Sequence, residues 1–375
     1  MTHRPWYARY PELAGRVRKL REQFTTRCEE LGASPSMVSG EVWQDIVARA
    51  VYESNWQEGI LVDRGKTKEL ALHVFAEIDR ISGPHLDIDR LVEAHKRHVV
   101  AHKRGGLSIE EIAAYNLSAA HVAVCWIAEE LAKRQSASLV HALNQFRALG
   151  LSTRAGLPGD AKEAVQRGFE IIDGLLEDNT HPVAPITEGY FTEGQVLRDL
   201  LAVPVGDLLN PMRVEYIHLL HRIVLMGVAD PRRCGTFRKT PVHVGDADVL
   251  FPPPSLVPEM VNEFCREFPT ILPTTVKYDP VLKAAEASYE FVRIHPYHDG
   301  NGRVSRLLMN LVLWGHHPPV YLKADKKGRH RYAQALKRAN RGDMEPLGCL
   351  IAMALAQIYE KLIDAVGARE EGGSR

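Results

Sequence analysis

The chain has 375 residues, of which 45% are hydrophobic and 25% are charged, a composition that excludes extensive disorder and allows one large domain or two. Lysine plus arginine and aspartate plus glutamate both number 47, so no overall charge favours a nucleic-acid partner or cationic substrates. The cysteines form no CxxC pair, which excludes a disulfide framework or a cysteine-rich zinc site and is typical of a reducing cytosol; they are Cys28, Cys125, Cys234, Cys265 and Cys349.

The first residues, MTHRPWYARYPEL, contain no apolar segment of the kind found in signal peptides. No apolar run in the chain is long enough for a membrane-spanning helix. We therefore expect a cytoplasmic protein without a membrane partner.

The first informative stretch is a helix that Ser39 can cap. Its apolar stripe is formed by Val42, Ile46, Ala50 and Val51. The same helix continues through Ser54 and Glu58, which are four residues apart and therefore share one face. Gly59 follows directly and is a typical residue for ending a helix.

Helices are also expected from about residue 60 to 180, because apolar residues recur there at spacings of three and four. We expect N-terminal helices over 1–60, a helical insertion or subdomain over 61–185, a core domain over 186–366 and a polar tail over 367–375. The glycine- and proline-bearing segments at 150–160 and 178–189 indicate the boundaries of the middle region.

Three histidines of this region, His95, His98 and His102, fall on one helical face at a spacing that suits metal ligands. Lysines and arginines surround them, and no acidic residue nearby in the sequence completes a coordination shell. A solvated basic face is therefore the favoured interpretation, with a weak acidic-partner or nucleic-acid patch as the alternative.

The segment from Gly235 to Gly245 alternates as a short strand would and ends in a turn, so we expect a β-hairpin packed on the helical body. Taken alone, it could be an ordinary surface hairpin.

The most specific stretch is IHPYHDGNGRVSR, residues 294–306. Gly300 and Gly302 can adopt the positive φ values that direct several N–H groups toward one anion, and a helix is expected to begin near Asn301. Arg303 and Arg306 are three residues apart on that helix, and their planar guanidinium groups match phosphate oxygens. These residues predict a polyphosphate site.

Two further side chains in this stretch predict chemistry at the phosphate. Asp299 would repel a polyphosphate unless a divalent cation lay between them, and magnesium is the cation that suits carboxylate oxygens. His295 titrates near neutrality and could therefore accept a proton from an incoming hydroxyl.

The stretch resembles the signature HxFx(D/E)GNGRxxR of the Fic family of nucleotide transferases, with Tyr297 in place of the usual Phe. The resemblance implies a mainly α Fic fold, a helical bundle with a small β-hairpin flap and here an N-terminal helical extension. It also implies a protein adenylyltransferase that moves AMP from ATP to a hydroxyl side chain of a protein. Family members often form homodimers, so a homodimer is a further expectation.

The resemblance assigns a role to each residue of the signature. His295 is the general base and Asp299 holds Mg²⁺ between the α- and β-phosphates. The phosphates are bound by the backbone of Gly300, Asn301 and Gly302, by the Asn301 side chain, and by Arg303 and Arg306.

Residues 54–59, SNWQEG, are similar to the inhibitory motif (S/T)xxxE(G/N) of many Fic proteins. The resemblance implies that Glu58, supported by Ser54, pairs with Arg306 and keeps that arginine from the γ-phosphate. The alternative is a plain helix end closed by Gly59.

Two more groups of residues take family roles. The expected flap would bind an extended protein segment through its edge, formed by Thr240, Val242, Val244 and Gly245. Tyr332 and Asn340 would contact the nucleotide base, against the alternative of core packing and helix termination.

Three other functions compete with AMP transfer. Glu58 could orient a water that removes AMP from a modified protein. The pair His298-Asp299 resembles part of an HD-type metal phosphohydrolase, although that class needs neither the glycines nor the arginines. The third alternative is a non-catalytic module that binds nucleotide or protein.

Overall fold

The computed structural model describes residues 6–32, 35–82, 88–153, 212–243, 250–268 and 279–372. The α-helices in these ranges are α1 Tyr10–Glu30, α2 Pro35–Gln57, α3 Arg64–Ser82, α4 Ile88–Arg104, α5 Ile109–Thr153, α9 Val214–Leu225, α10 Val257–Arg266, α11 Pro280–Ile294, α12 Asn301–Leu313, α13 Lys326–Ala339 and α14 Glu345–Gly372. Short 3₁₀ helices cover Trp6–Ala8, Pro231–Arg233 and Pro254–Leu256. Within the described ranges, no helix combines the length and apolarity that crossing a bilayer would require.

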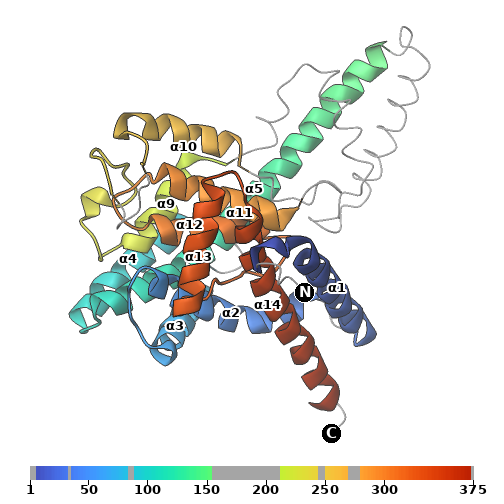
Figure 1. The fold of residues 1–375 in the computed structure, drawn as a ribbon, viewed down its shortest axis with the longest axis horizontal. Helices are drawn as coiled ribbons and strands as arrows, with labels where there is room; N and C mark the ends of the chain where they lie inside the picture. The colour runs from blue at the N-terminus through green and yellow to red at the C-terminus, as the bar shows by residue number, and fades with distance from the viewer. Residues whose placement is uncertain are drawn as a thin grey trace.

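Helix α12 lies at the centre of the molecule (Figure 1) and packs against α2, α5, α9 and α11. All of its residues except Gly302 are buried. A helix that is buried on every side must satisfy its polar side chains internally. Asn310 does so by exchanging two hydrogen bonds with the backbone of Val320, at 2.8 and 3.1 Å.

Helix α11 is fixed at its beginning by Asp279. The carboxylate of Asp279 accepts hydrogen bonds from the N–H groups of Val281 and Leu282, and Pro280 occupies the first helical turn, where its missing N–H costs nothing. The other carboxylate oxygen accepts a 2.6 Å hydrogen bond from the hydroxyl of Tyr10 on α1. The N-terminal helix thereby helps to place the helix that leads into the candidate site.

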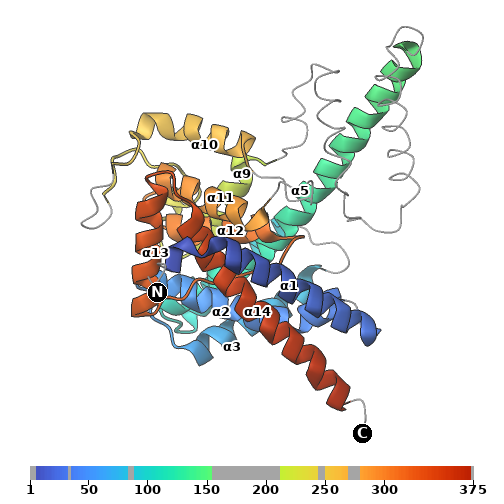
Figure 2. The ribbon, with the colours of Figure 1, turned by 45° about the vertical axis from the view of Figure 1, so that its right-hand side comes forward.

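Helices α1 and α14 lie side by side in both ribbon views (Figure 2). Buried residues from Tyr10 to Val366 form one continuous hydrophobic cluster, in which α1 and α2 pack on the elements that follow. The domain boundaries expected from the sequence stay a prediction. The cluster extends across the boundary at residue 60, and the boundary at residue 185 lies outside the described residues.

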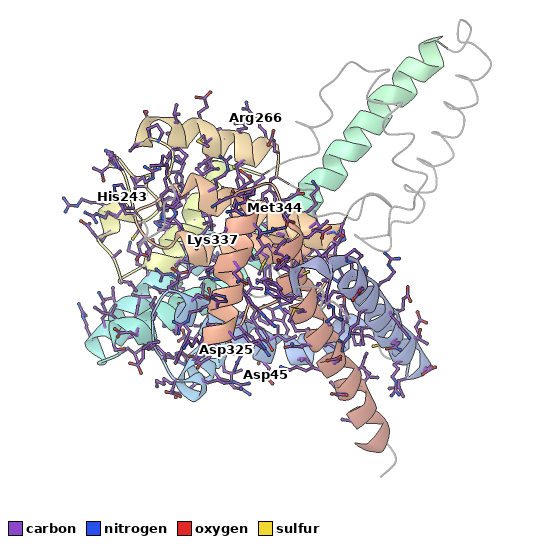
Figure 3. The ribbon with its side chains drawn as sticks, in the orientation of Figure 1. Asp45, His243, Arg266, Asp325, Lys337 and Met344 are labelled. Atoms are coloured by element: carbon purple, nitrogen blue, oxygen red, sulfur yellow. The ribbon has the colours of Figure 1, made fainter. Side chains whose placement is uncertain are left out.

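Helix α13 has an acidic residue at its N-terminal end and basic residues in its last turn. The Asp325 carboxylate caps it by accepting a 2.6 Å hydrogen bond from the N–H of Gly328, and Lys337 lies in its last turn, near the opposite end in Figure 3. Both charges suit the helix dipole.

The structure differs from the sequence expectations in three places. The described residues contain no strand: residues 236–243 are an extended, non-ladder segment, and Val244 and Gly245 lie outside the described residues. Helix α2 begins at Pro35, four residues before Ser39, which was expected to cap it. The boundary expected at 178–189 lies outside the described residues. Helix α14 continues to Gly372, through most of the expected tail.

Candidate active site

The turn between α11 and α12 forms the centre of the candidate site. His295 ends α11 in the left-handed conformation with a φ of 50°, and Gly300 precedes α12 with a φ of 78°. A side chain at Gly300 would be strained there and would also contact the ring of His221 at 3.4 Å. Among the described residues, His295 is the non-glycine residue with positive φ, a conformation that costs ~1–3 kcal/mol and is found mostly where function requires it.

The Asn301 side chain holds this turn in shape. Its Oδ1 accepts a 3.0 Å hydrogen bond from the N–H of Tyr297, and its Nδ2 donates a 2.9 Å hydrogen bond to the carbonyl of Tyr297. The side chain is buried, so both of its polar groups are engaged within the protein. The Asn301 amide therefore has a structural role in the turn, and its expected contact with phosphate stays a prediction, as do the contacts expected from the backbone.

Tyr297, the one departure from the signature, is fully buried beneath the turn. Its ring stacks on His221 with a centroid separation of 3.6 Å and an interplanar angle of 10°. Its hydroxyl lies 2.8 Å from Nδ1 of His218, which gives this extra polar group a partner. The ring thus packs as a phenylalanine would, and His218 on α9 provides a hydrogen-bond partner for the additional hydroxyl.

His221 on α9 is hydrogen-bonded to the turn. Its Nδ1 accepts a 2.8 Å hydrogen bond from the N–H of Gly235, so Nε2 carries the proton and donates at 2.9 Å to the carbonyl of Asp299. Burial lowers the pKa of His221 to about 4, which keeps the ring neutral. His221 was not predicted from the sequence. The signal that could have identified it is a polar side chain between the apolar residues Ile217 and Val224 of α9.

Arg238, also missed, joins the expected flap segment to the turn. Its buried guanidinium donates hydrogen bonds to three carbonyls, at 2.8 Å to His295, 3.4 Å to Thr240 and 2.5 Å to Pro252. Its N–H donates to the carbonyl of Pro296 at 2.9 Å. Burial lowers the pKa of Arg238. No feature of the sequence distinguished this arginine from the exposed ones.

His295 lies against the same segment, with its ring centroid 4.3 Å from that of Phe251. Burial lowers the pKa of His295, while the carboxylates of Glu58 and Asp299 act in the opposite direction. The imidazole is therefore neutral at physiological pH, the form that can accept a proton. Its Nδ1 is buried, which leaves Nε2 as the nitrogen that can meet a substrate hydroxyl.

Arg303 and Asp299 form the second part of the site. One Asp299 oxygen accepts hydrogen bonds from the N–H of Gly300 at 2.6 Å and from Nη2 of Arg303 at 3.3 Å. The Asp299 side chain is 63% exposed, whereas that of Arg303 is 1% exposed. Nε and Nη1 of Arg303 are buried without a hydrogen-bond partner among the described residues, and a buried guanidinium in that condition is suited to an anion.

Arg306 is bound by the two residues of the expected inhibitory motif. Its Nε donates a 2.7 Å hydrogen bond to the Ser54 hydroxyl, and its Nη2 donates at 3.0 Å to the Ser54 carbonyl and at 2.5 Å to the Glu58 carboxylate. The Glu58 carboxylate lies directly over Gly302 in the first turn of α12, where any Cβ would collide with it. An anionic side chain thus occupies the positive end of α12.

The two residues expected at the nucleotide base have different surroundings. Tyr332 lies close to Arg306 and Glu58, and burial raises its pKa. Asn340 ends α13, and its Oδ1 accepts a 2.8 Å hydrogen bond from the Tyr289 hydroxyl. Their role in base binding stays a prediction.

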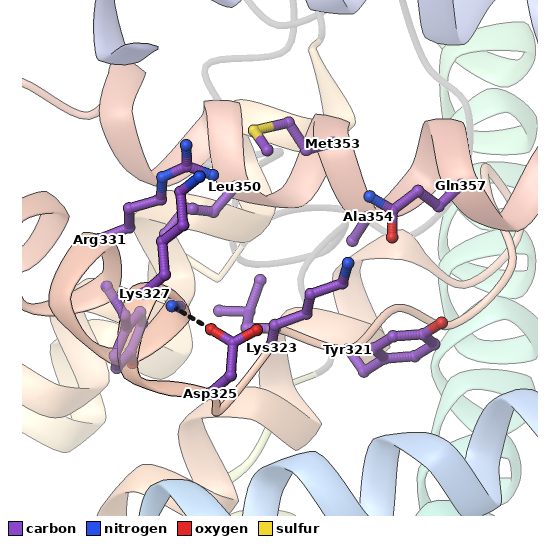
Figure 4. Close-up of a pocket in the computed structure, with 12 residues that line it drawn as sticks. Tyr321, Lys323, Asp325, Lys327, Arg331, Leu350, Met353, Ala354 and Gln357 are labelled. Carbon is purple, nitrogen blue, oxygen red and sulfur yellow. Dashed lines mark hydrogen bonds between the residues drawn. The ribbon is translucent and has the colours of Figure 1, made fainter.

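A cavity of about 280 Å³ lies between α13, α14 and the segment from Tyr321 to Asp325, and Tyr332 is one of the residues that line it (Figure 4). Lys327 and Arg331 extend along one side of it, opposite Gln357. Its lining includes Tyr332 but neither Asn340 nor any residue of the turn at 295–306, so it is separate from the predicted phosphate site.

The predicted residues therefore divide into three groups. The turn, both arginines of α12 and the inhibitory pair come together, although Ser54 and Arg306 are 252 residues apart in the chain. Thr240 and Val242 lie in the extended segment, with the Thr240 carbonyl bound by Arg238. Val244 and Gly245 lie outside the described residues.

Part of the chain, which includes the turn and α12, is similar in sequence to known proteins. Residues 211–313 match the model of the Fic/DOC family. Protein adenylyltransferase Fic of Aedes aegypti is 41% identical over 134 residues, which is 36% of this chain and 26% of that protein. Protein adenylyltransferase fic-1 of Caenorhabditis elegans is 38% identical over 160 residues, 42% of this chain and 30% of that protein. The chain thus covers less than a third of the length of either relative.

A crystal structure of a Fic-domain-containing signaling protein from Bacteroides thetaiotaomicron shares the fold. It is 16% identical, with a TM-score of 0.53 over 94% of this chain and 98% of that chain. Residues 211–313, which include His295 and both arginines of α12, are therefore the part of this chain that is similar to the Fic/DOC family.

Proposed function

We propose that this protein transfers AMP from ATP to a hydroxyl side chain of a protein substrate and is held inactive by Glu58. One observation carries the proposal: His295, Asp299, Arg303 and Arg306 converge on the place where the Glu58 carboxylate meets the first turn of α12. An anion-binding helix end next to a neutral imidazole is the arrangement that phosphoryl-group transfer requires.

The proposed reaction is a single displacement at the α-phosphorus. The substrate hydroxyl oxygen forms a bond to that phosphorus, the bond to the oxygen bridging to the β-phosphate breaks, and pyrophosphate leaves. The hydroxyl proton moves to Nε2 of His295. The backbone at the start of α12 binds the phosphates, while Arg303 and Arg306 neutralise the distal ones.

Asp299 fits magnesium as a ligand. Its side chain is 63% exposed, and only one of its oxygens receives the two hydrogen bonds from Gly300 and Arg303. Magnesium usually combines one or two carboxylates with waters and phosphate oxygens, so a single exposed carboxylate is sufficient. When bound, the ion would neutralise charge on the α- and β-phosphates.

Inhibition by Glu58 follows from competition for Arg306. The carboxylate and the Ser54 oxygens together occupy Nε and Nη2 of this arginine. A preference of ~2–3 kcal/mol for that paired state would leave about 1–3% of molecules with Arg306 free for phosphate.

Intact-mass measurement of a Glu58→Gly variant with ATP and Mg²⁺ tests both parts. We expect the variant to gain the mass of AMP on itself faster than the parent protein does. The matched control is Glu58→Gly combined with His295→Ala, which should label ~10²–10⁴-fold more slowly because the proton acceptor is missing.

Equal labelling with and without His295 would refute the mechanism, and equal labelling with and without Glu58 would refute the inhibition. A gain of phosphate instead of AMP would identify a different transfer on the same site.

The reverse activity uses the same residues, because Glu58 also lies close enough to influence His295. Release of AMP from a pre-modified protein by the parent, but not by Glu58→Gly, would favour it. The HD-type alternative gains no support, since the group of side chains close enough to hold a metal among the described residues is His73, Glu77 and His102, and it includes neither His298 nor Asp299. The protein substrate and a homodimer stay predictions.

A further inference from the structure

A second cluster of polar side chains lies in the hairpin formed by α3 and α4, outside the Fic/DOC match. His73 and Glu77 are four residues apart on α3, and His98 and His102 are four apart on α4, so each pair shares a helix face. The two faces meet: one Glu77 oxygen, Oε1, lies 3.1 Å from Nε2 of His73 and 3.1 Å from Nδ1 of His98. We call these four residues the α3–α4 cluster.

The spacing within the cluster suits a metal ion. Candidate ligand atoms of His73, Glu77 and His102 all lie within 4.8 Å of one another. Ligands of a tetrahedral zinc ion are roughly 3.3–3.5 Å apart, given bond lengths of about 2.0–2.2 Å, so small rotamer adjustments would bring these atoms together. The rings of His73 and His102 already lie 5.4 Å apart, centroid to centroid.

One atom of the cluster is left without an explanation by the protein alone. Nε2 of His102 is buried and has no hydrogen-bond partner among the described residues. Buried polar atoms are almost always paired, so such an atom indicates a partner that the described residues do not supply, such as an ion or a water.

The remaining oxygen of Glu77 is held from a third helix. The hydroxyl of Tyr115 on α5 donates a 2.6 Å hydrogen bond to Oε2, while Oε1 faces the histidines. Metal-binding carboxylates are typically fixed in this way by a hydrogen bond to the oxygen that does not bind the metal.

We propose that the α3–α4 cluster is a zinc site, with His73, Glu77 and His102 as ligands and a water in the open fourth position. Two imidazoles and one carboxylate suit zinc, whereas magnesium and calcium prefer an all-oxygen shell. A bound ion would tie α3 to α4 and, through Tyr115, to α5. The site is independent of AMP transfer.

From the sequence, a solvated basic face was favoured over a metal site for His95, His98 and His102. His95 is buried and lies 2.8 Å from Oδ1 of Asn116, so it belongs to the core and not to a solvated face. The missing acidic ligand and a further histidine come from α3, which no spacing within α4 could reveal.

The test is equilibrium dialysis of the full chain, with any purification tag removed, against ZnCl₂ at neutral pH. We expect saturation at one zinc per chain, a higher melting temperature when zinc is present, and an intense visible absorption band when Co²⁺ replaces zinc. His73→Gln is the first variant, because its partly exposed ring can be replaced without disturbing the core. It should weaken binding at least tenfold, as should Glu77→Gln.

Two further variants separate the proposal from nonspecific binding. Tyr115→Phe should weaken zinc binding by ~10–100-fold, because the carboxylate loses the partner that orients it. His330→Gln, at an exposed position of α13, should change nothing. If folded His73→Gln and Glu77→Gln bind zinc as the parent does, or if the parent shows no saturable binding, the proposal is wrong.

Discussion

At the scale of single residues, the position of Glu58 depends on three independent features. Arg306 donates to its carboxylate, Gly302 leaves room for it, and the first turn of α12 offers a positive dipole end. Ser54 contributes separately, since its hydroxyl and carbonyl hold the same guanidinium. The inhibitory contact is therefore a network and not one ion pair.

Ser54→Ala should release inhibition only in part. The substitution removes the acceptor for Nε of Arg306 but leaves the Glu58 contact, and a hydrogen bond to a charged group contributes ~1.5–3 kcal/mol. We expect self-labelling with AMP to rise above that of the parent and to stay below that of Glu58→Gly, measured as initial rates from intact mass. A rate equal to the parent's would show that Ser54 does not support the paired state.

Tyr297→Phe restores the usual signature residue, yet it should destabilise this protein. The Tyr297 hydroxyl and Nδ1 of His218 are 2.8 Å apart, and removing the hydroxyl leaves the nitrogen unpaired in a partly buried place. We expect the free energy of unfolding, from urea titration, to fall by about 1 kcal/mol. The transfer rate in the Glu58→Gly background should change little, because the ring packing is retained.

A double-mutant cycle with His218→Leu provides the control for this prediction. If the effect arises from the pair, Tyr297→Phe should cost much less when His218 is already absent. Additive costs would contradict the assignment.

At the scale of elements, the turn at residues 295–300 owes its shape to neighbours that are distant in the sequence. Arg238 binds the carbonyl of His295 and, through Thr240 and Pro252, holds the extended segment beside it. His221 binds the carbonyl of Asp299 from α9. The conformation of the predicted general base is thus set by α9 and the segment that follows it.

Arg238→Lys tests this dependence. A lysine ammonium lacks the planar fork that reaches several carbonyls from one position, so at least one buried acceptor loses its partner. We expect the free energy of unfolding to fall by about 2–4 kcal/mol. The transfer rate in the Glu58→Gly background should fall as well, since His295 loses an anchor.

The matched control is Arg233→Lys, an exposed arginine of the 3₁₀ helix just before the segment. It should leave both quantities unchanged. A similar effect of both substitutions would mean that Arg238 has no special role.

The sequence was sufficient where the chemistry is local. The residues from His295 to Arg306 are contiguous, and their order alone predicted the turn, the helix that follows and the convergence of both arginines. The sequence was insufficient where the partners of a residue are distant in the chain. Nothing distinguishes Arg238 from an arginine on the surface, and Glu77 and His102 lie on two different helices. The expected hairpin is not seen in residues 236–243, where Arg238 binds the Thr240 carbonyl and no strand is formed, and the rest of it lies outside the described residues.

At the scale of the whole molecule, one hydrophobic cluster joins the N-terminal helices, the Fic/DOC match and α14. Several histidines are enclosed by it. His121 on α5, which lines a small cavity with Arg303 and Arg306, and His316 after α12 are buried with lowered pKa values, as is His221. The pKa of the half-buried His317 is lowered as well. Folding therefore selects their neutral forms.

This burial makes stability depend on pH. The pKa is lowered to about 4 for His121, His221 and His316 and to about 3 for His317, mainly by burial, against 6.5 as the ordinary value. Above pH 6.5 these groups are neutral in both states, so their contribution to stability is fully present. As the pH falls from 6.5 toward 4, the unfolded chain binds protons that the folded chain refuses, and stability is lost by up to about 1.4 kcal/mol per pH unit for each histidine.

Urea unfolding at pH 7.5, 6.5, 5.5 and 4.5 checks this sign. We expect a somewhat lower midpoint at pH 6.5 than at pH 7.5, because the histidines of the unfolded chain are then half-protonated, and a steep decrease below pH 6.5. His121→Met removes one titrating group from the core, so its curve should be shallower below pH 6.5 by up to about 1.4 kcal/mol per pH unit. Replacing the exposed His330 with Gln should leave the slope as it is. A parent protein equally stable at pH 7.5 and 4.5 would show that these histidines accept protons without unfolding, and that the core around them admits water.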